Sequence, residues 1–190
     1  MAIKTVHDGD ILERNGRQFR VNILDDDDRE PPWDRSDGHG PVRKVNRSHC
    51  SQDAGKHPGE RPMNSPDRNE YQFFYDWQAA CKQARAEGWN TEPYDAPNRI
   101  ARAVQADFEF LSGWVNDQWR YVGVVCTDVT DDEEAPNEYA SALWGVESCA
   151  GAYLLEVAEE LIAEQLAGYA CDEQQARIAS RFNDAMDCGV

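Results

Sequence analysis

The sequence predicts an α+β fold: a mostly antiparallel sheet with three to four helices packed on it, an N-terminal hairpin and a long polar loop. Three observations carry this prediction. A hairpin signal lies near the N-terminus, an apolar strand pattern spans Gln118–Thr130, and helical periodicity recurs in three segments, 76–87, 97–112 and 150–170. We expect one acidic domain over residues 1–190, because a chain of this length can build a single core.

The N-terminal hairpin is predicted from Asn15 and Gly16, which lie between Asp10–Arg14 and Arg17–Leu24. A two-residue type I′ turn needs positive φ at both central positions, and Asn and Gly tolerate this. Apolar residues then alternate along the second strand, at Phe19, Val21 and Ile23. Four consecutive aspartates, 25–28, follow and are expected to end the strand.

Gln118–Thr130 is the strongest strand pattern in the chain. It is rich in β-branched residues and apolar on both faces, which is typical of a central strand. A second strand near Ser141–Glu147 is expected to return antiparallel to it.

The helices have recognisable ends. After a short strand at Tyr71–Tyr75, Asp76 is expected to cap a helix that Gly88 stops. Asp95 and Pro97 are expected to open the next helix, which runs to about Ser112. The strongest helix is expected at 150–170, followed by a weaker one at 172–186.

Residues 30–69 form a long polar stretch with six of the nine prolines, three of the four histidines and seven basic residues. A loop of this length is uncommon in a compact domain unless it is functional or packed against something. We therefore expect an ordered loop anchored by Trp33 and Val42.

Composition limits the class of protein. The net charge is −17, yet 41% of residues are hydrophobic and six are Trp, which disordered acidic chains lack. No apolar run approaches the roughly 18 residues of a membrane helix, and the start MAIKTVHDGD has no apolar export signal. The six cysteines form no CxxC pair and are expected to be free thiols in a reducing cytoplasm.

The charge is unevenly distributed. Residues 1–75 carry 12 Lys/Arg against 14 Asp/Glu, whereas residues 76–190 carry 7 against 22, a net of −15. This self-repulsion is tolerated more readily when solubility or a cationic partner is at stake. It disfavours direct binding to a nucleic-acid backbone, so we expect a basic protein or nucleoprotein complex as the partner.

The first candidate site is an acidic surface on a loop and on the adjoining helix. Carboxylates at i and i+4 of a helix stand ~6 Å apart, comparable to phosphates along a nucleic-acid strand, so the surface can mimic a nucleic acid. The alternative is a solvated face that keeps the protein in solution. The candidate partner-binding residues are Asp128, Asp131, Asp132, Glu133, Glu134, Glu138, Glu156, Glu159, Glu160 and Glu164.

The second candidate lies in the polar stretch, which contains His and Cys, two residue types that bind zinc. Their spacing matches no established zinc pattern, so the alternative is a set of ordinary loop residues, with His39 hydrogen-bonded in a turn. The chain also lacks established nucleophile, phosphate-loop, metalloprotease and calcium-loop motifs; no cofactor is predicted. The residues concerned are Asp34, Asp37, His39, His49, Cys50 and His57.

Tryptophans form a third candidate, because aromatic side chains can stack bases on a single-strand platform. The negative charge argues against this, and we interpret them as core residues. They are Trp33, Trp89, Trp114, Trp119 and Trp144.

Several sequence blocks carry a family resemblance: PPWDRSDGHGPV, PGE at 58–60, YDWQAA…AEGW and WRYVGVV…SALWGVES…YLLEVAEELI. From about Phe19 to Glu164 the chain resembles a family of uncharacterised accessory proteins of tailed phages. The resemblance implies a phage product made in the cytoplasm of the bacterial host. It implies no activity and no site residues.

These observations favour a non-enzymatic phage inhibitor of a host nucleic-acid-handling defence system, of anti-CRISPR or anti-restriction type. The protein would act through its acidic, nucleic-acid-mimicking surface. One alternative is a small phage enzyme or a metal- or ligand-binding protein that uses the His/Asp-rich segment 34–57. A further alternative is a virion or assembly component.

Overall fold

The computed structural model describes residues 5–27, 30–46, 55–65, 70–89, 98–131 and 140–187, with side chains described up to residue 180. It contains helices and two antiparallel sheets, so the predicted α+β class is confirmed. The chain divides into two compact units. Unit 1 comprises residues 1–28 and 121–190, and unit 2 comprises residues 29–120.

Unit 1 is a four-stranded antiparallel sheet in the order β1-β2-β6-β7, with a long C-terminal helix. The Asn15-Gly16 turn joins β1 to β2 with φ of 52° and 75°, as the hairpin prediction requires. β6 lies in the centre of the sheet, between β2 and β7, and is buried along almost its whole length. The elements are β1 (Asp10–Arg14), β2 (Arg17–Asp25), β6 (Tyr121–Asp128), β7 (Ser141–Glu147) and α4 (Ala152–Asp187).

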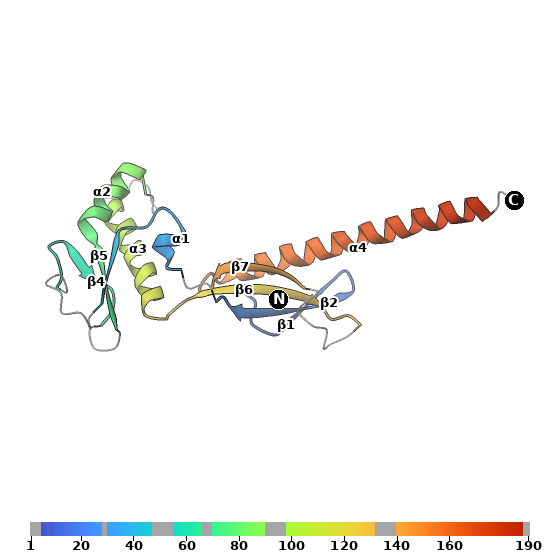
Figure 1. The fold of residues 1–190 in the computed structure, drawn as a ribbon, viewed down its shortest axis with the longest axis horizontal. Helices are drawn as coiled ribbons and strands as arrows, with labels where there is room; N and C mark the ends of the chain where they lie inside the picture. Colours follow the sequence, from blue (N-terminus) through green and yellow to red (C-terminus); the bar gives the residue numbers. More distant parts are fainter. Residues whose placement is uncertain are drawn as a thin grey trace. The chain divides into compact units, whose positions relative to one another are not determined.

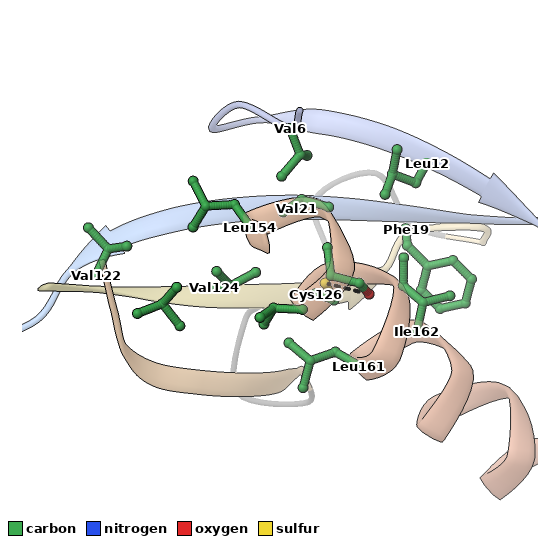
Figure 2. Close-up of a cluster of buried hydrophobic side chains, with 13 residues drawn as sticks. Val6, Leu12, Phe19, Val21, Val122, Val124, Cys126, Leu154, Leu161 and Ile162 are labelled. Atoms are coloured by element: carbon green, nitrogen blue, oxygen red, sulfur yellow. Dashed lines mark hydrogen bonds between the residues drawn. The ribbon is translucent and has the colours of Figure 1, made fainter. Parts of the chain in front are cut away.

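The core of unit 1 lies between this sheet and the first half of α4 (Figure 2). Alternate residues of β6, Val122, Val124 and Cys126, face Leu154 and Ile162 from the helix. Each fully buried aliphatic side chain of this kind contributes about 1.5–3 kcal/mol. The thiol of Cys126 also contacts the backbone carbonyl of Ala158 at 3.7 Å, which ties the strand to the helix.

Helix α4 continues past the end of the sheet (Figure 1). Every side chain from Cys171 to Ser180 is exposed. The two helices predicted at 150–170 and 172–186 are therefore one continuous helix, and that boundary was wrong. Neither Gly nor Pro occurs between Ala170 and Asp172, so no helix-breaking residue separates the two predicted helices. Among the described residues, no helix is long and apolar enough to cross a membrane.

The described residues of unit 2 form a three-stranded antiparallel sheet in the order β3-β5-β4 and three helices. The sheet is formed by β3 (Val42–Asn46), β4 (Glu60–Pro62) and β5 (Tyr71–Asp76). The helices are α1 (Pro32–Arg35), α2 (Trp77–Glu87) and α3 (Arg99–Val115).

A separate hydrophobic cluster holds unit 2 together. Tyr75 from β5, Ala80 and Ala84 from α2, and Val104 and Leu111 from α3 are its fully buried members. Trp33 and Val42 pack against this cluster, so their predicted role as anchors is confirmed.

The ends of α2 follow the sequence signals. The Asp76 carboxylate accepts a hydrogen bond from the Ala79 amide at 2.9 Å, and Gly88 ends the helix with φ of 71°. Helix α3 begins at Arg99 after Asn98, whereas Asp95 and Pro97 lie outside the described residues.

The sequence patterns predict one domain with three helices packed on the β6 sheet. The structure instead places α2 and α3 in unit 2, where they help to form its own core. Unit 2 is inserted between β2 and β6, which are paired neighbours. Asp25 pairs with Val122, and the Asp26 amide donates to the Tyr121 carbonyl at 3.2 Å. Both ends of the insertion thus leave unit 1 at one place, where an inserted unit is well tolerated.

The stretch at 30–69 is not the loop that was expected. It contributes α1, β3 and β4, and both strands pair with β5. Two of its charged residues also link the outer strands: Arg43 on β3 forms an ion pair with the buried Glu60 on β4 at 2.7 Å. These strands could not be predicted from the polar sequence of the segment, because their pairing depends on partners distant in sequence.

Candidate functional site

The negative charge belongs almost entirely to one unit. Unit 1 carries 6 Lys/Arg against 22 Asp/Glu, a net of −16, whereas unit 2 carries 13 against 14, a net of −1. The asymmetry seen along the sequence is therefore a property of a folded unit. It is stronger than the division at residue 75 indicates, because the inserted unit holds most of the basic residues.

Two of the predicted acidic residues are engaged within unit 1. Asp128 forms an ion pair with Arg17 at 2.6 Å, and Glu159 forms one with Arg14. Burial raises the pKa of Asp128, but hydrogen bonds from Thr130 and Arg17 outweigh this effect and hold its pKa below the usual value. Both ion pairs join the N-terminal hairpin to other elements of unit 1, so these two carboxylates have a structural role.

Three other predicted residues, Glu156, Glu160 and Glu164, are exposed on α4. They recur every four residues and so lie on one side of the helix, about 6 Å apart along its axis. The opposite side carries Ala158 and Ile162, which are buried in the core. No ion pair of these three glutamates with another described residue occurs in the structure. We call them the glutamate row.

Asp131, three residues after the end of β6, is also exposed. The remaining predicted acidic residues, Asp132, Glu133, Glu134 and Glu138, lie outside the described residues. The described part of the acidic surface therefore consists of the glutamate row and Asp131.

The predicted ligands of the polar segment that the structure describes form no metal-binding cluster. Asp34 lies in α1, and the His57 amide donates to Glu60 at 2.7 Å in the β4 region. His49 and Cys50 lie outside the described residues. Within the part of the chain that the structure describes, no group of three His, Cys, Asp or Glu side chains is placed to hold a metal ion.

His39 instead pairs with a residue that the sequence did not indicate, Asp107 on α3. Its Nδ1 lies 2.7 Å from Asp107 Oδ1. The other carboxylate oxygen accepts hydrogen bonds from the Gly40 amide at 2.8 Å and from the Tyr75 hydroxyl at 2.7 Å. The His39 and Asp107 side chains are 18% and 8% exposed, so a buried carboxylate orients an imidazole that still reaches the surface.

The turn that presents His39 depends on the glycines on either side. Gly38 has φ of 96°, a conformation that side chains other than glycine rarely adopt. A Cβ atom at Gly40 would overlap the ring of Tyr75. The two glycines of the DGHG sequence are therefore explained by the backbone conformation of the turn and by its close approach to Tyr75. Its partners Asp107 and Tyr75 lie 68 and 36 residues away, and no spacing rule connects them.

An open pocket of about 480 Å³ lies beside His39. The aromatic side chains of Trp89 and Phe110 line it, together with Ala103 and Ala106 of α3. The imidazole is stacked on the Phe110 ring, with 5.7 Å between centroids and 9° between planes. This arrangement is an oriented imidazole at the edge of an aromatic pocket.

Most of these tryptophans pack in the core, as we interpreted them from the sequence. Trp33 and Trp114 make an edge-to-face contact at 5.4 Å, and both pack against the unit 2 cluster, as does Trp89. Trp119 is 6% exposed and packs against Phe110 in a tilted arrangement. Trp144 differs: it is 49% exposed, because it lies on β7 at the edge of the sheet and covers Gly123.

The fold and its two candidate sites define a two-unit α+β protein with one strongly acidic unit and one nearly neutral unit. No protein-family model matches the chain, and neither a curated protein nor a solved structure matches it significantly.

Proposed function

We propose that this protein is a non-enzymatic phage inhibitor of a bacterial defence system. Its partner would be a basic, nucleic-acid-handling protein or nucleoprotein complex, such as a CRISPR effector or a restriction enzyme. The observation that carries the proposal is the net charge of −16 on unit 1, which includes an exposed, unneutralised glutamate row.

Electrostatics supports this choice of partner. Like charges gathered on one unit create a potential that attracts a cationic surface and repels a phosphate backbone. The glutamate row is held on a helix whose other side is core, so the backbone positions that carry its charges are ordered before binding. Pre-ordered charges favour fast and specific association, because little conformational freedom is lost.

Two carboxylates of the predicted acidic surface already form ion pairs within unit 1, so we propose that a smaller surface binds the partner. Asp128 and Glu159 are already paired with Arg17 and Arg14, so their charges are partly neutralised. The glutamate row and Asp131 then supply the described part of the proposed binding surface, to which the sequence adds the acidic residues at 132–134 and 138.

The test is inhibition of DNA cleavage by purified CRISPR effectors and restriction endonucleases, with the protein titrated at several salt concentrations. We expect inhibition that weakens steeply as salt rises, because salt screens exposed charges. The variant Glu156→Gln/Glu160→Gln/Glu164→Gln is expected to fold normally and to inhibit severalfold less well.

A matched control removes three acidic charges elsewhere in unit 1: Glu13→Gln/Asp172→Asn/Glu173→Gln. All three residues are exposed, so the net charge changes equally while the glutamate row stays intact. This control is expected to inhibit like the parent protein. The proposal fails if the parent neither inhibits nor binds such complexes. The assignment to the row fails if the two triple variants behave alike.

A further inference from the structure

The carboxylate of Asp107 explains much of the local structure around His39, but it does not explain why residue 39 is a histidine. Asp107 joins the Gly40 turn to β5 through its hydrogen bonds with the Gly40 amide and the Tyr75 hydroxyl. Both bonds would remain if His39 were replaced by another residue. A structural role for the turn therefore leaves the identity of residue 39 unexplained.

The hydrogen bond to Asp107 fixes the orientation of the imidazole and the position of its proton. An ionised carboxylate only accepts hydrogen bonds, so Nδ1 of His39 carries a proton. In the neutral ring Nε2 is then a hydrogen-bond acceptor. Among the described residues Nε2 has no hydrogen-bond partner, and the side chain remains 18% exposed beside the pocket.

The lining of the pocket limits the chemistry of a ligand. Trp89 and Phe110 offer aromatic surface, and Ala103 and Ala106 leave room next to it. Among the described lining residues Asp107 is the only one with a charge, and both of its oxygens are already bonded within the protein. The volume of about 480 Å³ lies within the range of small-molecule sites.

We propose that this pocket binds an uncharged, planar heteroaromatic ring with an N–H donor, of the chemical class of the nucleobases. The ring would lie against the aromatic side chains and donate its N–H to Nε2 of His39. His39 and Trp89 are the proposed binding residues, and Asp107 is a positioning residue that holds the imidazole in the accepting tautomer. This site lies within unit 2 and does not depend on the proposed function of unit 1.

The probes are the free nucleosides uridine and guanosine, each with a ring N–H, compared with 3-methyluridine and 1-methylguanosine, in which a methyl group replaces that donor. NMR titrations of the full chain would follow the tryptophan indole N–H signals and the imidazole nitrogens. We expect saturable shifts of the Trp89 and His39 signals with uridine or guanosine, and at least tenfold weaker binding of the methylated form.

Two variants test the residues. His39→Gln removes the aromatic acceptor and is expected to weaken binding at least tenfold, whereas His57→Gln, which lies outside the pocket, is expected to have no effect. Ala106→Leu changes an exposed helix position that lines the pocket, so it is expected to block binding without unfolding the unit.

The proposal is overturned if no nucleoside produces saturable shifts at Trp89 and His39. It is also overturned if the methylated nucleosides bind as well as the parent nucleosides. Unchanged binding to a correctly folded His39→Gln or Ala106→Leu variant would likewise contradict it.

Discussion

The hydroxyl of Tyr75 donates a hydrogen bond to Asp107 Oδ2 across 2.7 Å, and this tyrosine is fully buried. Burial, together with the neighbouring Asp107, raises the pKa of Tyr75 far above its usual value, so the donor proton is retained at all ordinary pH values. The bond links β5 to α3 and fixes the carboxylate that orients His39.

Tyr75→Phe should therefore destabilise unit 2 by about 1–2 kcal/mol, because Asp107 loses a donor inside the protein. Urea unfolding followed by tryptophan fluorescence measures this, since five of the six tryptophans lie in unit 2. An unfolding midpoint equal to that of the parent would show that the bond contributes nothing.

Gly40→Ala should destabilise unit 2 by at least about 1 kcal/mol, because the added methyl group would overlap the buried ring of Tyr75. Gly55→Ala is the matched control: its Cβ would meet nothing within 4 Å, so we expect a change within about 0.5 kcal/mol. The same fluorescence measurement applies to both variants. Equal stability of the two would refute the close approach of the turn to Tyr75.

The stability of unit 2 should fall in acid because of Glu60. Its hydrogen bonds with Arg43 and with the His57 amide outweigh burial and lower the pKa of Glu60 from 4.5 to about 2. A lowered pKa stabilises the folded state above pH 4.5, and this stabilisation is lost as the pH falls from 4.5 toward 2. The contribution is on the order of 2–3 kcal/mol.

Glu60→Gln should remove the Glu60 contribution to this pH dependence and should be less stable than the parent at pH 7. Unfolding by urea at pH 7, 4.5 and 3 tests the prediction, with Glu70→Gln, an exposed position, as the control. If the parent and Glu60→Gln lose stability equally between pH 4.5 and 3, the ion pair is not the cause.

Cys126 should resist alkylation in the folded protein. Burial, with a smaller effect of Glu159, raises the pKa of its thiol to about 12, and the side chain is fully buried. Iodoacetamide at pH 8 should modify the exposed Cys171 and leave Cys126 unmodified until urea unfolds unit 1. Peptide mass mapping over time measures this, and equal rates at the two cysteines would contradict the packing of α4 on β6.

Val125→Asp should destabilise unit 1 by several kcal/mol, because it places an unpaired charge at a position that is 3% exposed in the central strand. Ala142→Asp is the matched control, since Ala142 pairs with Val125 across the sheet but is exposed. Circular dichroism during thermal unfolding measures both. Similar melting temperatures for the two variants would argue against a central position for β6.

Local signals in the sequence determined several elements of this fold. The Asn15-Gly16 turn, the central strand β6 and the ends of α2 at Asp76 and Gly88 follow from preferences of a few adjacent residues. The amphipathic pattern of α4 likewise places the glutamate row opposite the core, because the helical period alone fixes which residues share a side.

Only the tertiary structure decided how these elements are grouped. The two units, the pairing of β3 and β4 with β5, and the contact between His39 and Asp107 join residues far apart in the chain. Hydrophobic burial is non-directional, so one sequence pattern is compatible with one core or with two. Similarly, the sequence does not distinguish an exposed acidic residue from one that forms an ion pair within the fold. Asp128 and Glu159 are distinguished from Glu156 and Glu160 only by the arginines that the fold brings to them.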